Sequence, residues 1–511
     1  MQGSDVSEVS TRERLISPAW KHFVKRASLS AVFCGLAMLA AAQTNAPKPN
    51  DPLEALRSQM QELRVALNDV RDQLAASRVE SKELRQELAD VRQQLATPKP
   101  QDSGIPDLTS PAEERQLLRA EIEDQYQTKV ESGSKYRVRL SGLAVLNVFS
   151  TRGAVDSLDV PKVATTKAPG DSNGTFGATA RQSQLGLHLL GPQWGSAKTT
   201  GDLAFDFFGG FPANSEGVTA GLVRLRTAKL TLDWANTTVM AGQDTPFFSP
   251  LSPTSLASLA YPALASSGNL WTWTPQAYVE HRLVVSDGKK VVLQAGVLDP
   301  LTGELPVEYN RAPTAGNRSR APAAAGRLAL QSRIGERLAT IGAGGYYSRQ
   351  NWGFGQMVDA WAATVDWDLP LGPWFSLSGE AYRGKSIGGL GGGVSGSVLF
   401  KTTAGNGGSS VLPLSSAGGW SQVKFKRAEN FEFNAAFGGD VPFRSGLGTF
   451  LAKRTIEGSP SSRNVSAFVN WIYQPRSNLM FSVEYRRLWT SGFYDPRQRA
   501  DHVSVSSGVV F

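Results

Sequence analysis

From residue 136 onward, apolar and polar residues alternate with a period of two, which predicts β-strands with one apolar and one polar face. In the segment 463–474, Val469 and Trp471 share one face, whereas Ser466 and Asn470 share the other. Sixteen segments of this kind can be marked, at 136–149, 181–190, 197–208, 222–234, 236–243, 274–285, 289–298, 325–335, 337–349, 355–368, 373–385, 417–426, 430–438, 463–474, 477–490 and 500–511.

The connections between these segments alternate in length. Every second one is a short turn such as SDGK or PRSN, whereas most of the others run from nine to more than thirty residues. Short turns at one rim and long loops at the other are typical of a bacterial outer-membrane barrel. A soluble β-sandwich is the alternative, and the count becomes eighteen if the segment 386–416 contains a hairpin. The predicted fold class is therefore an all-β transmembrane barrel of about 16 antiparallel strands, spanning 135–511.

A different period precedes the barrel. Between Leu53 and Leu95 the apolar residues step by three and four, which is the 3.5-residue period of a coiled coil. Ser77 and Ser81 interrupt this seam. We therefore predict an N-terminal α-helical coiled coil within 43–97 that self-associates in parallel, with a single solvated helix as the alternative. It carries arginine at every seventh position, at Arg57, Arg64, Arg71, Arg78, Arg85 and Arg92.

The first residues resemble a secretory signal. Basic residues precede a short apolar run that ends in three alanines, and this order predicts a signal peptide over 1–42, cleaved after Ala42. An uncleaved anchor is the alternative. The only cysteine, Cys34, lies within that run, so the mature chain would form no disulfide. Residues 98–134 read as a proline-containing linker followed by a short helix.

The sequence offers little support for catalysis. Gly379 to Ser386 matches the pattern of a phosphate-binding loop, but the glycine-rich residues that follow cannot form the helix which that loop requires. His188, His281 and His502 fall on different predicted strands. We therefore expect no enzymatic activity, no cofactor, no metal and no nucleic-acid partner.

One long connection stands out by its composition. Residues 242–276 contain a single charge, Asp244, among serines, prolines and aromatic residues. A largely uncharged loop of this size fits the interior of a barrel better than open water. We expect it to fold into the lumen, with packing on a neighbouring subunit as the alternative.

Positive charge is concentrated in the barrel. Residues 135–511 contain 36 Lys/Arg and 25 Asp/Glu, and arginines facing a narrow pore favour anions. Arg224 and Arg226 precede a change of parity in their strand, so the pattern leaves their direction open. The pore and constriction candidates are Arg181, Arg224, Arg226, Asp244, Arg282, Arg327, Arg333, Glu380 and Arg486.

Some of these residues also carry a resemblance to known proteins. The runs RQSQLGLHLLGP (181–192), GDLAFDFFGG (201–210) and LRTAKLTLDWANTTVMAGQDTPFFSPLSP (225–253), with the terminal VVF, resemble the trimeric porins. The plan of signal, coiled coil, linker and barrel is similar to that of the DcaP-like dicarboxylate porins. The resemblance implies a homotrimer, an inward-folded loop at the constriction, and recognition of the C-terminal aromatic Phe511 by the barrel-assembly machinery. This chain departs from cation-preferring porins because the loop has no acidic cluster.

The sequence thus predicts a porin in the bacterial outer membrane, surrounded by lipid and lipopolysaccharide, with its coiled coil in the periplasm. Its function would be passive, size-limited diffusion of small hydrophilic solutes, with a preference for anions such as dicarboxylates. A carbohydrate-type channel is one alternative, with Trp271, Trp273 and Tyr278 as the stacking surface for neutral solutes. An envelope tether or adhesin with a barrel anchor is another.

Overall fold

The computed structural model describes residues 137–212, 221–304, 311–353, 355–400, 411–443 and 461–511. The predicted signal peptide, coiled coil and linker lie outside these residues and stay predictions. Among the described residues, no helix is long and apolar enough to cross a membrane.

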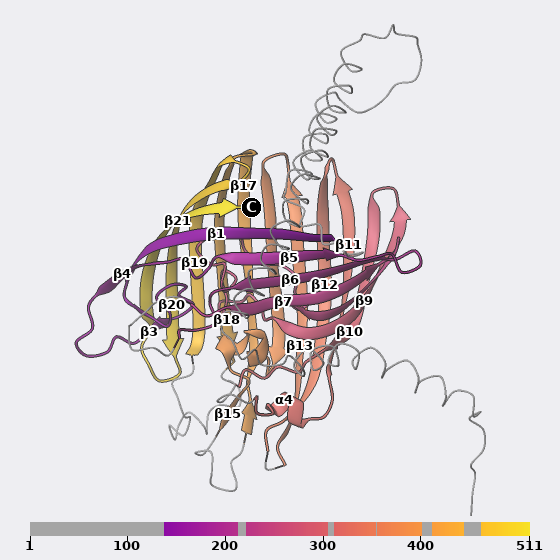
Figure 1. Ribbon diagram of the computed structural model, residues 1–511. Coiled ribbons are helices and arrows are strands. Elements are labelled where there is room, and N and C mark those ends of the chain that lie inside the picture. Colours follow the sequence, from indigo (N-terminus) through magenta and orange to yellow (C-terminus); the bar gives the residue numbers. More distant parts are fainter. Residues whose placement is uncertain (1–136, 213–220, 305–310, 354, 401–410, 444–460) are drawn as a thin grey trace, which may run out of the picture. The chain divides into compact units, whose positions relative to one another are not determined.

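The predicted barrel of sixteen antiparallel strands is confirmed (Figure 1). The closed sheet contains seventeen segments, of which β4 and β5 form two parts of one strand because both pair with β1. The strands of the sheet are β1 (Arg137–Arg152), β4 (Gly174–Thr179), β5 (Gln184–Leu190), β6 (Lys198–Asp206), β7 (Arg224–Asp233), β8 (Thr237–Asp244), β9 (Thr274–Ser286), β10 (Lys289–Leu298), β11 (Ala323–Ile334), β12 (Arg337–Asn351), β13 (Met357–Leu371), β14 (Phe375–Lys385), β17 (Ser415–Ala428), β18 (Phe431–Pro442), β19 (Ser461–Arg476), β20 (Leu479–Gly492) and β21 (Gln498–Val510).

The first and last strands close the barrel. β1 pairs with β21 from Leu143↔Val510 to Arg152↔Asp501. Beyond this register, the amide of Phe511 donates to the carbonyl of Gly142, at 3.0 Å, and the amide of Gly142 donates to that of Phe511, at 2.8 Å. The C-terminal residue therefore belongs to the seam, while its ring is 47% exposed.

The second strand is longer than predicted and is interrupted. It begins at Gly174 instead of 181, and residues 180–183 separate β4 from β5. At this break the amide of Val145 donates to the hydroxyl of Ser183, which donates in turn to the carbonyl of Val145. A side chain thus replaces the missing backbone ladder, which satisfies polar groups that the break would otherwise leave unpaired.

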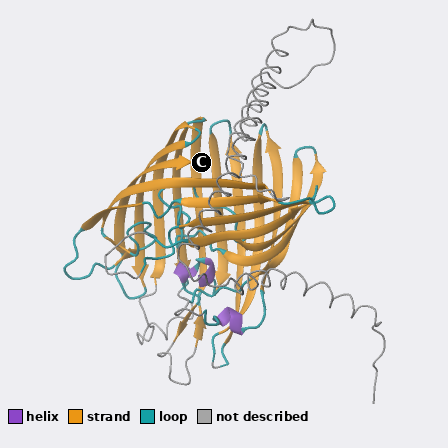
Figure 2. Cartoon of the chain, in the orientation of Figure 1, coloured by secondary structure: helices purple, strands orange, loops and turns teal. Residues whose placement is uncertain are grey.

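Short turns lie at one rim and long loops at the other, as predicted, and Figure 2 shows the loops gathered at that second rim and inside the wall. Two connections at the long-loop rim are short, at 352–356 and 493–497. The long loops carry α4 (Ala315–Arg318), η2 (Gly388–Leu390), η3 (Gly393–Ser395), and two small hairpins formed by β2 (Ala154–Val155) with β3 (Ala164–Thr165) and by β15 (Val398–Phe400) with β16 (Val411–Pro413).

The segment 386–416 does contain a hairpin, but β15 and β16 pair only with each other. They add no strands to the barrel, and the count of sixteen holds for the described residues. The residues that match the phosphate-loop pattern lie largely in β14, where Gly379 and Gly384 pair with β13. They are part of the barrel wall, so the match is a coincidence of sequence.

The alternation of faces is also confirmed. On β19, Asn470 points inward and is 1% exposed, whereas the neighbouring Trp471 points outward and is 44% exposed. Apolar side chains repeat this outward position around the wall, as Leu230, Ile341, Val365, Phe437 and Val505 show. Such a belt suits hydrocarbon, because apolar surface of this extent is costly in water.

Candidate functional site: loop 3 and the inner wall

Loop 3 (245–273) connects β8 to β9 and packs against inward-facing side chains of the barrel, so its predicted position in the lumen is confirmed. Its first half touches successive strands around the wall. The carbonyl of Phe248 accepts from Thr364 on β13, and the amide of Leu251 donates to Glu380 on β14. Further along, the carbonyl of Ala260 accepts from Arg224 on β7. Loop 3 therefore lines much of the inner circumference.

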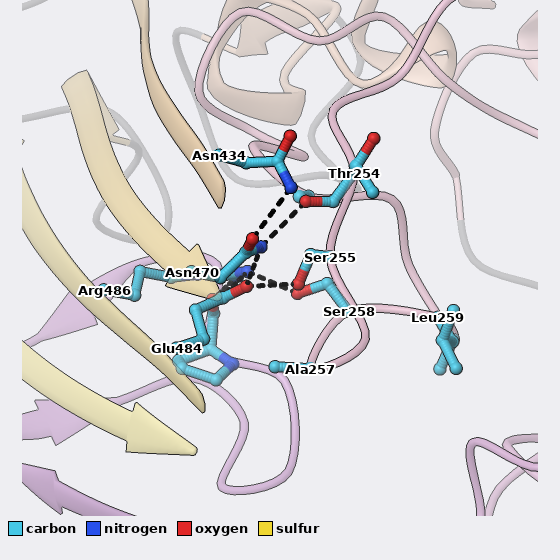
Figure 3. A network of polar contacts seen from close by, with 12 residues as sticks. Thr254, Ser255, Ala257, Ser258, Leu259, Asn434, Asn470, Glu484 and Arg486 are labelled. Carbon is cyan, nitrogen blue, oxygen red and sulfur yellow. Dashed lines mark hydrogen bonds and ion pairs between the residues drawn. The ribbon is translucent and has the colours of Figure 1, made fainter. Parts of the chain in front are cut away.

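The polar network in Figure 3 fastens loop 3 to β18, β19 and β20. Asn470 donates to the carbonyl of Thr254 at 2.9 Å and to Glu484 at 3.1 Å. Arg486 forms an ion pair with Glu484 at 2.7 Å and donates to the hydroxyl of Ser258. The side chains of Glu484 and Arg486 are only 1% and 5% exposed. Both charged groups therefore contact each other and loop 3.

Glu380 has a similar role on β14. It accepts from the hydroxyl of Ser249 and from the amide of Leu251, both at 2.7 Å, and it is 4% exposed. The prediction placed Glu380 on the polar face, and that face is where it lies. Its carboxylate holds loop 3, since both of its oxygens accept hydrogen bonds from that loop.

The second half of loop 3 returns along the same strands, backbone against backbone. Gly268 has a φ of +94°, and a Cβ at this position would lie 2.3 Å from the carbonyl oxygen of Gly419 on β17. A Cβ on Gly438 of β18 would lie 2.3 Å from the carbonyl oxygen of Ser267. Glycine is required at both positions because the two backbones approach more closely than any side chain permits.

The first part of loop 6, residues 386–400, packs on loop 3 near β14. Ile387 and Leu390 join Phe248, Leu270 and Tyr382 in one buried apolar cluster. The amide of Trp271 donates to the carbonyl of Leu390 at 3.0 Å. Loops 3 and 6 therefore fill part of the lumen with an apolar core, which narrows the pore at the long-loop side.

The inner faces of β7, β9, β10 and β11 carry a chain of charged and amide side chains. Arg282 pairs with Asp233 and with Glu280, each at 2.9 Å. Gln294 donates to Glu280 at 2.8 Å and accepts from Arg327 at 3.2 Å. Arg327 in turn pairs with Asp366 on β13 at 2.6 Å. Both predicted pore arginines on this side, Arg282 and Arg327, are therefore balanced by carboxylates.

Arg224 and Arg226 lie where loop 3 returns to the wall. A β-bulge resolves the change of parity in their strand: Ala204 pairs with Thr227 but Phe205 pairs with Leu225, so Arg226 is the extra residue. Both guanidinium groups lie over the ring of Trp273 in loop 3, at 4.7 and 4.9 Å from its centroid. Such stacking holds an arginine in a fixed orientation.

The two arginines share a single carboxylate. Arg224 donates to both oxygens of Asp206, at 3.0 and 2.6 Å, and this carboxylate is fully buried. Arg226 lies 3.9 Å from the same carboxylate, and its Nη1 is buried without a hydrogen-bond partner among the described residues. This cluster of Arg224, Arg226 and Asp206 has one positive charge in excess.

Of the other predicted residues, Arg181 lies beside that cluster, because the ring of Phe208 contacts both Arg181 and Arg224, at 4.0 and 5.6 Å from its centroid. Arg181 is buried between the rings of Phe208 and Phe211 and pairs with Asp159. Asp244 pairs with Lys229 at 2.6 Å. Arg333 is exposed beside the short turn between β11 and β12, far along its strand from loop 3.

Sequence reasoning missed the uncharged residues that hold the loop. Gln182 accepts from the amides of Leu259 and Ala260 and donates to the carbonyl of Ala257, yet it lies at the break between β4 and β5, where alternation gives no direction. The alternation of polar and apolar residues places Asn470 on the inner face, but it does not show that a loop covers this side chain. Of the proposed stacking aromatics, Trp271 and Trp273 form a T-shaped pair, whereas Tyr278 packs on Phe247.

Comparisons with known proteins support the fold. No protein-family model and no curated protein matches the chain. Among solved structures, the outer-membrane channel DcaP of Acinetobacter baumannii matches with a TM-score of 0.57 at 18% identity, over 75% of this chain and 100% of that one. The anion-selective porin from Comamonas acidovorans matches with a TM-score of 0.45 at 12% identity, over 74% of this chain and 100% of that one. The fold is that of bacterial outer-membrane channels, which agrees with the resemblance to DcaP-like porins.

Proposed function

We propose that the chain is an outer-membrane porin that passes small hydrophilic solutes by diffusion and prefers anions such as dicarboxylates. The supporting observation is the pair Arg224 and Arg226, which share one buried carboxylate, Asp206, beside loop 3. Positive charge held in a narrow pore, away from bulk water, lowers the barrier for anions and raises it for cations. No chemical step is involved.

The cluster also suggests why a dicarboxylate would be favoured. Arg224 already donates to both oxygens of Asp206 and to the carbonyl of Ala260, whereas Arg226 has only a distant contact with that carboxylate. A carboxylate of the solute can balance the positive charge that Asp206 leaves uncompensated in this pair of arginines. Guanidinium groups bind carboxylates with two parallel hydrogen bonds. The second carboxylate of the solute would follow along the channel.

The test is ion selectivity in planar bilayers. We expect a reversal potential that reports anion preference in a salt gradient, and Arg226→Gln should lower the anion-to-cation permeability ratio by about threefold. Arg226→Lys is the matched control because it keeps the charge and should keep most of the preference. Cation preference in the unaltered protein would refute the proposal, and a reversal potential near zero would favour the carbohydrate-type channel.

We also propose that the functional form is a homotrimer. The strands β6, β7 and β8 have 8 to 10 residues, whereas β19, β20 and β21 have 13 to 16. A tilted strand needs about 9–11 residues to cross a bilayer, so part of the short wall is poorly matched to lipid. A neighbouring copy can cover it, and the predicted coiled coil would hold the copies together.

Removal of residues 51–97 tests the role of the predicted coiled coil. The shortened barrel should still insert, but its trimer should dissociate at lower temperature in semi-native gels. The full-length chain serves as the reference. An unchanged dissociation temperature would exclude the coiled coil as a stabiliser of the trimer.

A further inference from the structure

The outward faces of β17, β18, β19 and β20 form a groove of about 470 Å³ that the channel function does not use. The small side chains Ser421, Ala435 and Ala467 form its floor, and the larger Phe437 and Trp489 stand beside them. Ser421 and Ala467 are the cross-strand partners of Phe437 on either side, so the surface is low beside this ring. The result is a mostly apolar groove on the outer surface of the barrel.

Arginines surround the end of this groove that lies toward the long-loop rim. Arg487 lines the groove itself, and Arg497 lies over the ring of Trp489, at 5.7 Å from its centroid. Arg499 is the cross-strand partner of Trp489, and Arg463 lies two positions beyond Val465, which also pairs with Trp489. Among the described residues, Asp501 lies beside Arg487 and Arg499, and Asp495 precedes Arg497 by two residues.

Arg487 and Arg499 have N–H donors that are not used by Asp501. Arg487 pairs with Asp501 through Nε at 2.5 Å, and Arg499 lies 4.0 Å from the same carboxylate. Their side chains are 37% and 59% exposed. The hydroxyl of Tyr485 also donates to Asp501, so this carboxylate is already shared among several donors. The cluster therefore carries a clear excess of positive charge toward the outside of the barrel.

The position of the arginine cluster along the barrel wall matches the level of lipid headgroups. From Arg487 to the short-turn end of β20 at Leu479, the outward residues are Tyr485, Val483 and Phe481, all substantially exposed. Eight residues of a tilted strand span about 20 Å, close to the apolar band of about 25 Å in outer-membrane barrels. The arginines thus lie at the level where the hydrocarbon ends on the long-loop side.

We propose that this surface is a binding site for a phosphorylated glycolipid of the outer leaflet, such as lipopolysaccharide. One acyl chain would lie in the groove between Phe437 and Trp489, and a phosphate would bind Arg487 and Arg499. Arginine suits this role because its planar donors match phosphate oxygens two at a time. The site requires the barrel to lie in the outer membrane, but it does not depend on the ion preference of the pore.

Native mass spectrometry of the detergent-purified full-length protein tests the proposal. With bisphosphorylated lipid A as the probe, we expect one retained lipid per chain, and about tenfold less retention for the double variant Arg487→Gln/Arg499→Gln. The matched control is Arg427→Gln/Arg476→Gln. It removes two exposed arginines from the short-turn ends of β17 and β19, at the rim opposite to the arginine cluster. Ala467→Trp, which fills the groove, should also reduce retention.

Three outcomes would overturn the proposal. They are equal retention of a dephosphorylated lipid A, unchanged retention in the arginine variant, or full competition by inorganic phosphate, which would indicate a simple anion site. Co-purification of a second chain on this face, lost with Ala467→Trp, would assign the surface to protein contact. Heat-modified gel mobility verifies that each variant folds, and unchanged conductance of the variants separates this test from that of the pore.

Discussion

Two parts of the inner wall carry similar polar residues with opposite accessibility. On the covered wall, formed by β14, β17, β18, β19 and β20, the ion pair Glu484–Arg486 is 1% and 5% exposed beneath loop 3. On the open wall, formed by the parts of β7, β9 and β10 nearer the short turns, the pair Glu280–Arg282 is 21% and 25% exposed. Within the described residues, loop 3 contacts account for this difference. A charged side chain that faces the lumen therefore binds loop 3 where the loop covers it, and is accessible to the pore where the loop does not.

This contrast has an energetic meaning. A buried ion pair has lost its hydration, so either partner becomes costly once the other is removed. An accessible pair keeps much of its hydration, and water can take over from the missing partner. Equivalent substitutions on the two walls should therefore differ strongly in their effect on stability.

The largest effect is expected for Glu484→Gln. The amide cannot neutralise Arg486, which stays buried beside Ser258, and we expect a loss of about 3–5 kcal/mol in the free energy of unfolding. Urea unfolding of the refolded protein in detergent measures it. Glu336→Gln, at an exposed turn, is the control, and the double variant Glu484→Gln/Arg486→Met should recover part of the loss. An unfolding midpoint equal to that of the control would contradict burial as the cause.

A smaller effect is expected for Glu380→Gln. The amide keeps the size of the side chain but can accept only one of the two hydrogen bonds from Ser249 and Leu251. The loss should be about 1.5–3 kcal/mol, as for hydrogen bonds to charged groups. Differential scanning calorimetry measures the stability, and single-channel recordings should show noisier current as loop 3 loosens. Quiet recordings at full stability would show that this carboxylate does not hold the loop.

The smallest effect on stability is expected for Arg282→Gln on the open wall. Because both partners are partly exposed, the loss should be about 0–1 kcal/mol. The same urea unfolding experiment checks it, with the unaltered protein as reference. A loss as large as that of Glu484→Gln would show that the two walls do not differ in the way we describe.

Much of the fold could be predicted because each strand has lipid on one side and the lumen on the other. Apolar and polar residues therefore alternate within the strand itself, which can be seen in a short stretch of sequence. All sixteen barrel strands overlap predicted segments, and the inward direction of Asn470 followed from parity alone. The break at 180–183 escaped that logic, whereas the change of parity after Arg226 was visible in the sequence and only its cause, a β-bulge, was not. A hairpin within 386–416 was the alternative that would have raised the count to eighteen, but β15 and β16 pair only with each other and the predicted sixteen strands hold.

The candidate site was less accessible to sequence reasoning. Parity places Glu380, Arg327 and Arg486 on the inner face, but it cannot tell which of them a loop will cover. That depends on the path of loop 3, which is set by contacts with residues far away in the sequence, such as Gln182 and Asn470. The excess charge at Arg224 and Arg226 likewise depends on their sharing Asp206 across two strands.

The seam between β1 and β21 has a consequence for the order of folding. Loop 3 is synthesised near the middle of the chain, but Ser255 donates to Glu484, a partner 229 residues later. Until β20 is in place, the loop has no carboxylate there to accept its hydrogen bonds, and β20 is held at one edge by the last strand. Contacts between distant segments form late because the intervening chain must first be ordered. Narrowing of the pore should therefore be completed together with the barrel, since β20 carries Glu484 and Arg486, two of the groups that fix the loop.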